Sequence, residues 1–279
     1  MNLSPWLRRL SGLVLVLFAG YVAVAVVVML RQRTMYYHPA HISTAGLTVF
    51  AQERSMLPWT NAAGLRVGWQ RKSHSLPAQG AVLILHGNGG TAIGREYISD
   101  PLQAALPLDL FILEYPGYAD RPGEPTQESF LAAADEAFQQ LTNRAPLYLV
   151  TESIGTGPGA WLAGKYPQCV AGLCDLVPYN NLTAVAHRRM PWLPVGLLLW
   201  DHFPADEWLK NYHGPMAVCV GGEDQTIAPE LGRALYDGYA GPKKYWLLPG
   251  QDHVEATKRP VEWWREVGEF WRGERKDVR

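Results

Sequence analysis

Short apolar runs alternate with segments of helical spacing along most of this chain, and this alternation restricts its fold more than any other feature. Runs with the composition of strands occupy residues 81–85, 108–115, 146–150, 170–177, 216–220 and 245–248. The first of them is apolar throughout, which is typical of a strand buried on both faces of a parallel sheet. Strands and helices that alternate in this way predict a doubly wound, mostly parallel α/β sheet.

Several other segments have a clear secondary-structure preference. We expect a half-exposed strand at residues 64–71, where apolar and polar residues alternate. Helices are expected at residues 92–106, with an interruption at Pro101, and at residues 128–142, 155–163, 229–239 and 261–271. Residues 38–50 are expected to form a linker. A chain of 279 residues is long enough for one α/β folding unit with a large core.

Ser153 follows the run at residues 146–150, in the sequence Thr151-Glu152-Ser153-Ile154-Gly155. A serine between a strand and a helix has the setting of a nucleophile elbow. This tight turn exposes the hydroxyl and aims the next backbone N–H, here that of Ile154, at a developing oxyanion. The usual pattern is G-x-S-x-G, and Thr151 replaces its first glycine, where the lack of a Cβ lets strand and helix approach closely. Ser153 is therefore a candidate nucleophile in a weakened motif.

Two polar residues in later loops could complete a catalytic triad with Ser153. Asp224 follows the run at residues 216–220, and His253 follows the run at residues 245–248. Taken alone, each of the three could be an ordinary loop residue. Together, in the order serine, aspartate, histidine and each at the end of a strand, they favour catalysis. Ser153 would be the nucleophile, His253 the general base, and Asp224 the acid that orients the histidine.

Other assignments of the acid and the base remain open. Asp175 lies near the end of the run at residues 170–177, where some triad enzymes place the acid, and its orientation cannot be read from the sequence. Three histidines, His187, His202 and His213, have no strand directly before them and are weaker candidates for the base. Asp224 is preferred as the acid because its loop follows a later strand.

The run at residues 81–85 leads into the glycine-rich sequence His86-Gly87-Asn88-Gly89-Gly90. Acyl transfer needs two backbone N–H donors aimed at the oxyanion. The N–H of Asn88 is the best candidate for the second donor beside that of Ile154, and His86 is expected to be structural. A glycine-rich turn that binds nothing is the alternative. A phosphate loop is disfavoured because the Lys-Ser/Thr that should follow is missing.

These sequences resemble the α/β-hydrolase superfamily, and most closely its N-terminally membrane-anchored serine hydrolases that carry a His-Gly-Asn loop. The resemblance is carried by residues 86–90, 114–118, 152–158, 222–229 and 251–253, and it spans residues 47–271. It implies the α/β-hydrolase fold and the hydrolysis of carboxylic esters, thioesters or related acyl bonds without a cofactor. Besides Thr151, Ala119 departs from the pattern, at a position where this branch often has a second glycine.

Two other functions remain open. Thr151 at the elbow favours a membrane-tethered, non-catalytic, hydrolase-like binding protein, which the complete set of triad residues opposes. A serine peptidase is a weaker alternative, because no propeller or peptide-binding domain precedes the fold.

The amino-terminal segment is apolar over the length of a membrane span. Residues 10–30 contain no charged residue, with Arg8 and Arg9 before them and Arg31 and Arg33 after them. At about 1.5 Å per residue this segment reaches the roughly 30 Å of a bilayer core. We therefore expect an uncleaved, single-pass membrane anchor over residues 1–33, followed by a hydrolase domain over residues 34–279.

A signal peptide is the competing interpretation of this segment. The sequence Ala23-Val24-Ala25 matches the small-residue cleavage pattern. The apolar run continues past it to Leu30, which suits a membrane span better. The side of the membrane is nearly undetermined, because two arginines flank each end. The free amine adds only a slight bias toward an amino terminus inside the cell.

An insertion at residues 178–213 interrupts the alternation of strands and helices. The family that this chain resembles commonly has a cap over the active site at this point, and the insertion contains an apolar, proline-broken stretch at residues 190–200. Trp192, Leu197 and Trp200 are candidates for contacting a lipid-like acyl substrate or the membrane. Equally, they could pack the cap against the body of the domain.

Composition restricts the partners of the chain. A formal net charge of −1 argues against a nucleic-acid partner, which would require a basic face. Cys169, Cys174 and Cys219 lie in or beside apolar runs and are expected to be buried thiols. No Cys/His spacing suggests a metal site. The expected partners are a small-molecule or lipid-like acyl substrate and the membrane, with neither a metal nor a cofactor.

Overall fold

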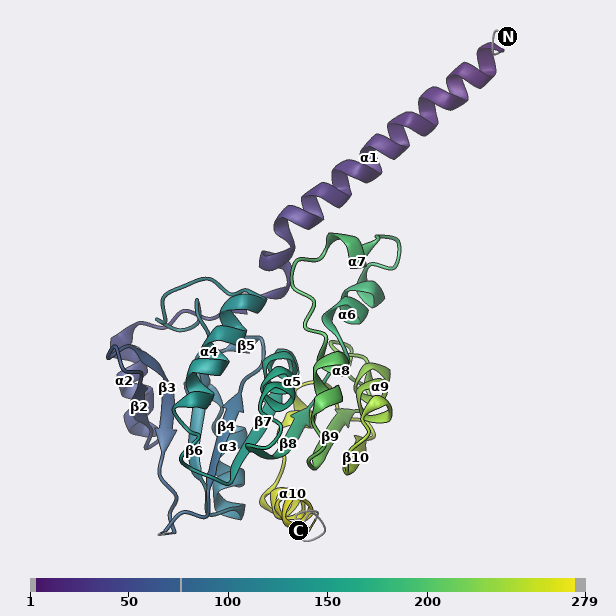
Figure 1. Cartoon of the computed structure of the whole chain (residues 1–279). Helices are drawn as coiled ribbons and strands as arrows, with labels where there is room; N and C mark the ends of the chain where they lie inside the picture. Colours follow the sequence, from purple (N-terminus) through teal and green to yellow (C-terminus); the bar gives the residue numbers. More distant parts are fainter. Residues whose placement is uncertain (1–3, 76, 274–279) are drawn as a thin grey trace.

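An eight-stranded sheet lies at the centre of the protein in the computed structural model, which describes residues 4–75 and 77–273 (Figure 1). In spatial order the strands are β10 (Lys243–Leu248), β9 (Met216–Gly221), β8 (Val170–Leu176), β7 (Leu147–Glu152), β4 (Ala81–Leu85), β6 (Asp109–Leu113), β3 (Arg66–Arg71) and β2 (Leu57–Thr60). Strand β3 runs antiparallel to both of its neighbours, and every other neighbouring pair is parallel. The doubly wound, mostly parallel sheet predicted from the sequence is confirmed.

The order of the strands reverses at β4, and this fixes where a site can form. The chain crosses from β4 to β6 on one side, and then places β7 on the other side of β4. In open α/β sheets, ligands bind beyond the carboxyl ends of the strands at such a switch point. Here the loops after β4 and β7 are in contact, since the Gly87 N–H donates to Glu152 at 2.8 Å.

Helices cover both faces of the sheet above two continuous apolar cores. On one face pack α4 (Gln127–Gln139), α5 (Thr156–Lys165) and α9 (Pro229–Gly238). On the other face pack α2 (Thr44–Glu53), α3 (Glu96–Ala105) and α10 (Val261–Gly273). Helix α4 begins at a capping box formed by Thr126 and Ser129 and buries Phe130 and Phe138 against the sheet. Except for α2, these helices match the segments predicted from helical spacing.

The expectation of a linker at residues 38–50 is wrong. This segment contains the short strand β1 (His38–Pro39) and most of helix α2. The Ser43 hydroxyl accepts the Gly46 N–H as an N-cap, and α2 buries Leu47 and Ala51. The helix is stabilised by this tertiary burial, which its short sequence does not reveal.

The predicted interruption of the helix at residues 92–106 lies at a different residue. The break occurs at Arg95, between the 3-10 turn η1 (Ala92–Gly94) and α3, and Pro101 lies inside α3. Proline removes one backbone hydrogen bond from a helix. Ile98 and Leu102, both fully buried, flank it and hold the turns around it against the core.

The insertion at residues 178–213, called the cap below, contains α6 (Leu182–Arg189), α7 (Val195–Leu198), α8 (Ala205–Trp208) and the 3-10 turn η3 (Leu209–Asn211). The part with α6 and α7 lies beyond the carboxyl ends of the strands, and the part with α8 packs beside α5 on one face of the sheet (Figure 1). Pro194 and Pro204 directly precede α7 and α8, which are each a single turn long. The cap therefore has little regular structure of its own and depends on packing against its neighbours.

Helix α1 (Pro5–Tyr36) projects away from the rest of the molecule (Figure 1). Within the described residues it is the one helix long and apolar enough to cross a membrane, with a mean hydropathy of 2.9 over its best window. It extends beyond both ends of the predicted span at residues 10–30. Near its carboxyl end Ala25 and Val28 pack with Leu193 and Val195 of the cap. The outer limits of the two expected domains, residues 1 and 279, lie outside the described residues.

The three cysteines do not share one environment. Cys174 and Cys219 are buried, as expected, whereas Cys169 is exposed. The exposed thiol lies in the turn between α5 and β8, just outside the apolar strand that suggested its burial.

Candidate active site

Ser153 lies in the turn between β7 and α5 with a left-handed backbone. Its φ is 52°, a region that residues other than glycine rarely adopt. The 3-10 turn η2 (Ser153–Gly155) leads directly into α5. The turn is tight, because a Cβ at Gly155 would lie 2.1 Å from the Leu85 carbonyl oxygen. A serine held in this way between strand and helix has the conformation of a nucleophile elbow.

Thr151, the departure from the elbow motif, is accommodated by a glycine on the following helix. A Cβ at Gly159 would lie 2.3 Å from the Thr151 Cγ2, so the absence of a side chain at residue 159 makes room for the threonine methyl group. The Thr151 hydroxyl donates to Asp175 Oδ1. In the usual motif a glycine on the strand lets strand and helix approach closely. Here Gly159 on helix α5 has that effect.

His253, in the loop after β10, bridges Ser153 and Asp224. Its Nε2 lies 3.1 Å from Ser153 Oγ, and its Nδ1 lies 2.6 Å from Asp224 Oδ2. Asp224 is buried, and its Oδ1 accepts the N–H groups of Thr226 and Ile227 at 2.7 and 2.8 Å. These bonds fix the carboxylate, which favours the histidine tautomer that is protonated at Nδ1. Nε2 is then able to accept the serine proton.

Asn88 and Ile154, the expected oxyanion donors, line the same pocket as Ser153 and His253. The Asn88 side chain accepts the His38 N–H at 3.0 Å and the Tyr118 hydroxyl at 2.8 Å, and it donates to the Tyr36 carbonyl. In addition, β1 pairs with β5 (Gly89–Gly90). The glycine-rich loop is thereby bound to the chain that leaves α1, a contact that the sequence did not predict.

A buried ion pair holds the glycine-rich loop from its other side. Arg95 Nε lies 2.8 Å from Glu152 Oε2. Glu152 also accepts the Gly87 N–H at 2.8 Å and the Tyr97 hydroxyl at 2.6 Å. Burial alone would raise the pKa of Glu152, but the Arg95 charge and these hydrogen bonds outweigh it and hold the pKa below its ordinary value. Sequence reasoning missed Glu152, although its position next to Ser153 was an available signal.

We expect Glu152→Gln to lower the free energy of unfolding by about 3–5 kcal/mol at neutral pH, because the buried Arg95 charge loses its partner. Folding lowers the pKa of Glu152, so its contribution to stability is full above the ordinary glutamate pKa of about 4.3 and is lost as pH falls through the folded-state value. The difference from wild type should therefore shrink in acid. Urea unfolding at neutral pH and at about pH 3.5 measures this change.

Glu96→Gln is a suitable control for this experiment, because the Glu96 side chain is 42% exposed and pairs with Arg54 at the surface. Its expected cost is at most about 1 kcal/mol. A cost at Glu152 that stayed constant with pH would contradict the stabilising role of the ionised pair.

Ser153 and His253 line a pocket of about 840 Å³. Besides the loops that carry these two residues, its walls include the glycine-rich loop, the cap and the end of α1. The aliphatic and methionine residues of the cap in this wall are Leu182, Val185, Ala186, Met190, Val195, Leu198 and Leu199, and α1 contributes Val28, Met29, Gln32, Met35 and Tyr36. A mostly apolar pocket beside a candidate nucleophile suits an acyl group.

Trp192, Leu197 and Trp200, expected to contact substrate, do not line this pocket. Their side chains are 54%, 87% and 46% exposed. The Trp192 ring lies 6.3 Å from that of Tyr21, and the Arg33 guanidinium lies 5.2 Å from the Trp200 ring. The same segment lines the pocket through Met190, Leu198 and Leu199 instead. The sequence could not show this, because a proline-broken segment has no period that shows which side faces inward. Contact of the exposed residues with a membrane stays a prediction.

The alternative acid and bases lie elsewhere. Asp175 is fully buried and bonded to Thr151, and no bond joins it to His253 in the described part of the chain. His202 Nδ1 lies 3.1 Å from the Thr183 hydroxyl, and His86 Nε2 lies 3.2 Å from Glu114. Among residues 4–75 and 77–273, no group of three or more His, Cys, Asp or Glu could hold a metal ion.

Comparisons with known sequences find relatives over most of the chain, although no family model matches it. It is 29% identical over 256 residues to the uncharacterized protein Rv2307c of Mycobacterium tuberculosis, covering 88% of this chain and 90% of that protein. It is 26% identical over 207 residues to the lysophosphatidylserine lipase ABHD12 of Danio rerio, covering 64% of this chain and 52% of that one. It is 28% identical over 165 residues to alpha/beta hydrolase domain-containing protein 17C of Homo sapiens, covering 56% and 47%.

Solved structures share the arrangement of strands and helices. The esterase Pf2001 of Pyrococcus furiosus superimposes with a TM-score of 0.62 at 15% identity, over 85% of this chain and 96% of that one. Est1E from Butyrivibrio proteoclasticus, bound to ferulic acid, superimposes with a TM-score of 0.63 at 15% identity, over 79% and 100%.

Proposed function

Since this chain has the α/β-hydrolase fold and relatives named for it, we propose that it is a serine hydrolase that cleaves carboxylic ester or thioester bonds. One observation carries the proposal. Hydrogen bonds run without a break from Asp224 through His253 to Ser153, with separations of 2.6 and 3.1 Å. Ser153, the proposed nucleophile, lies in a strained elbow beside a mostly apolar pocket.

The proposed mechanism is a two-step acyl transfer. Ser153 Oγ attacks the acyl carbonyl carbon while its proton passes to His253 Nε2, and Asp224 stabilises the imidazolium. The backbone N–H groups of Asn88 and Ile154 bind the oxyanion, each contributing about 3 kcal/mol. The leaving alcohol or thiol takes the proton from His253 and departs, leaving an ester on Ser153. Water then attacks this ester with His253 as the base, which releases the acid and restores the serine.

We also propose that α1 is an uncleaved, single-pass membrane anchor. Its apolar stretch is long enough to span a bilayer. Ala25, the last residue of the possible cleavage motif, is 9% exposed and packs in the cluster with Leu193 and Val195. Cleavage after Ala25 would therefore remove part of the packing between α1 and the cap. The weak bias toward an amino terminus inside the cell stays a prediction.

The alternative of a non-catalytic binding protein rested on Thr151. The contact between Thr151 and Gly159 removes that motivation, because the elbow tolerates the larger residue. No described feature specifically favours a peptidase.

Labelling of membranes that contain the full chain with a fluorophosphonate probe tests this function. A serine activated by a neighbouring histidine is expected to form a covalent adduct, which peptide mass spectrometry should locate on Ser153. Absence of labelling at Ser153, under conditions that label a known serine esterase, would favour the binding protein instead.

A further inference from the structure

The geometry points to the last turns of helix α1 as part of the substrate site. We propose that Val28 and Met29 form the far wall of the acyl pocket and set the length of acyl chain that the enzyme accepts. This inference rests on the proposed ester hydrolysis. It gives the anchor helix a role in specificity in addition to tethering the domain to the membrane.

One face of α1 is directed at the cap and the pocket. Ala25, Val28, Met29, Gln32 and Tyr36 follow one another at helical spacing, and all are at least partly buried. The intervening Val27 and Leu30 are 59% and 62% exposed. Apart from Ala25, the residues of this face line the same pocket as Ser153 and His253. From Val28 to Tyr36 the wall extends about 12 Å along the helix axis.

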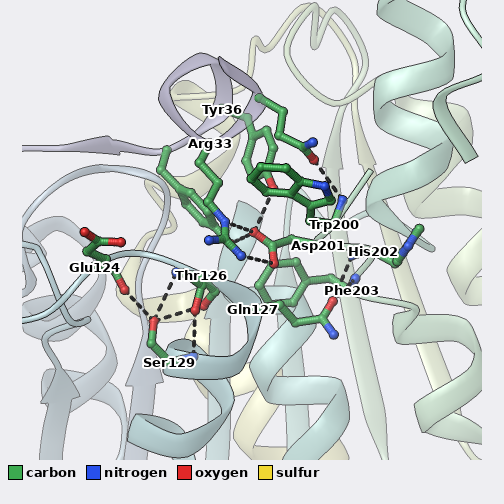
Figure 2. Close-up of polar contacts among 12 residues, drawn as sticks. Arg33, Tyr36, Glu124, Thr126, Gln127, Ser129, Trp200, Asp201, His202 and Phe203 are labelled. Atoms are coloured by element: carbon green, nitrogen blue, oxygen red, sulfur yellow. Dashed lines mark hydrogen bonds and ion pairs between the residues drawn. The ribbon is translucent and has the colours of Figure 1, made fainter. Parts of the chain in front are cut away.

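Buried polar contacts lock this part of α1 to the cap. Gln32 donates to the Leu198 carbonyl at 3.0 Å and accepts the Trp200 N–H at 2.8 Å, so it satisfies two backbone groups of the cap. Asp201 is 3% exposed, pairs with Arg33 at 3.2 Å and accepts the Tyr36 hydroxyl at 2.8 Å. Figure 2 shows Arg33 and Tyr36 converging on this carboxylate. A wall held by such contacts is rigid enough to discriminate between ligands.

The same cap segment is held from its other side by the body of the domain. Gln127, at the start of α4, accepts the N–H groups of His202 and Phe203 at 2.8 and 2.7 Å (Figure 2). Residues 201–203 are therefore fixed between α1 and α4. Contacts within the chain therefore position the last turns of α1 relative to the body of the domain.

The occupant that fits this wall is the acyl chain of the substrate. Val28 and Met29 line the same pocket as Val195, Leu198 and Ser153, so a methylene chain bound there is buried against apolar side chains. Both residues also belong to the uncharged stretch at residues 10–30. The far end of the pocket therefore lies where the helix enters the bilayer, and an acyl chain can pass from lipid into the pocket along α1.

The test compares the full-length wild type with Val28→Trp, using 4-nitrophenyl butanoate and 4-nitrophenyl dodecanoate as substrates. A bulky residue at the far wall should exclude the end of the long chain only. The ratio of kcat/KM for dodecanoate to that for butanoate should fall by about 15-fold, which corresponds to the lost burial of two methylenes. Leu30→Trp, on the exposed side of the same helix, should change this ratio by less than about twofold.

Two measurements separate the possible failures. If the wild type hydrolyses both esters and Val28→Trp leaves the ratio unchanged, or lowers both rates equally, the role of α1 in chain-length selection is overturned. If the wild type hydrolyses neither ester and Ser153 is not labelled by a fluorophosphonate, the proposed function fails and this inference fails with it. Met29→Trp serves as the second variant should Val28→Trp not fold.

Discussion

Ser153→Ala is expected to lower kcat for a short activated ester by at least about 10⁴-fold, because the substitution removes the atom that attacks the carbonyl. The melting temperature should change little. Alanine is as strained as serine at a φ of 52°, and the change removes one hydrogen bond, to His253. Initial rates with 4-nitrophenyl acetate and a thermal unfolding curve measure the two quantities.

Ser73→Ala is a matched control for this experiment. Ser73 is also buried, at 6% exposed, but it is not among the residues that line the pocket. Its replacement should leave the rate within about twofold of wild type. Substantial hydrolysis by the Ser153 variant, with the control behaving normally, would exclude Ser153 as the nucleophile.

Asp224→Asn is expected to lower kcat by about 10³–10⁴-fold while the loop keeps its shape. The Thr226 and Ile227 N–H groups hold one oxygen of this side chain, so the asparagine oxygen should stay on them and its NH₂ group should face His253. His253 must then accept a hydrogen bond from this NH₂ group at Nδ1 and carry its own proton at Nε2. In that tautomer Nε2 can no longer accept the serine proton. The pH profile of kcat/KM and the ester rate, measured together, test this change of tautomer.

Asp175→Asn is the counterpart that separates the two candidate acids. Burial raises the pKa of Asp175 to about 7 despite the hydrogen bond from Thr151, which lowers it. A side chain that is so easily neutralised and points at a threonine is not suited to stabilise an imidazolium. This variant should keep its rate within about threefold of wild type. If Asp175→Asn abolished hydrolysis and Asp224→Asn did not, the assignment of the acid would be reversed.

The sequence by itself determined the parallel part of the sheet, though not the edge strand β2, and the positions of the three candidate catalytic residues along the chain. Period and composition are local properties, and the run at residues 81–85 is indeed a fully buried central strand. In a parallel sheet the carboxyl ends of the strands lie at one edge, so polar residues after separate strands come together without any information about side chains. Ser153, Asp224 and His253 could be grouped for this reason, and the resemblance to α/β-hydrolases that they helped to suggest is confirmed by the comparisons.

Only the tertiary structure decided what surrounds these residues. Asn88 bonds to Tyr36, 52 residues away, and Gln32 bonds to Leu198, 166 residues away. Contacts between such distant segments leave no period in the sequence, so the sequence could not show that α1 lines the pocket. For the same reason the exposed Trp192 of the cap could not be distinguished from its buried neighbour Leu193. The space that Gly159 leaves for the Thr151 side chain was likewise visible only in the tertiary structure. It depends on how closely one helix packs on one strand, and packing distance is a property of the folded chain.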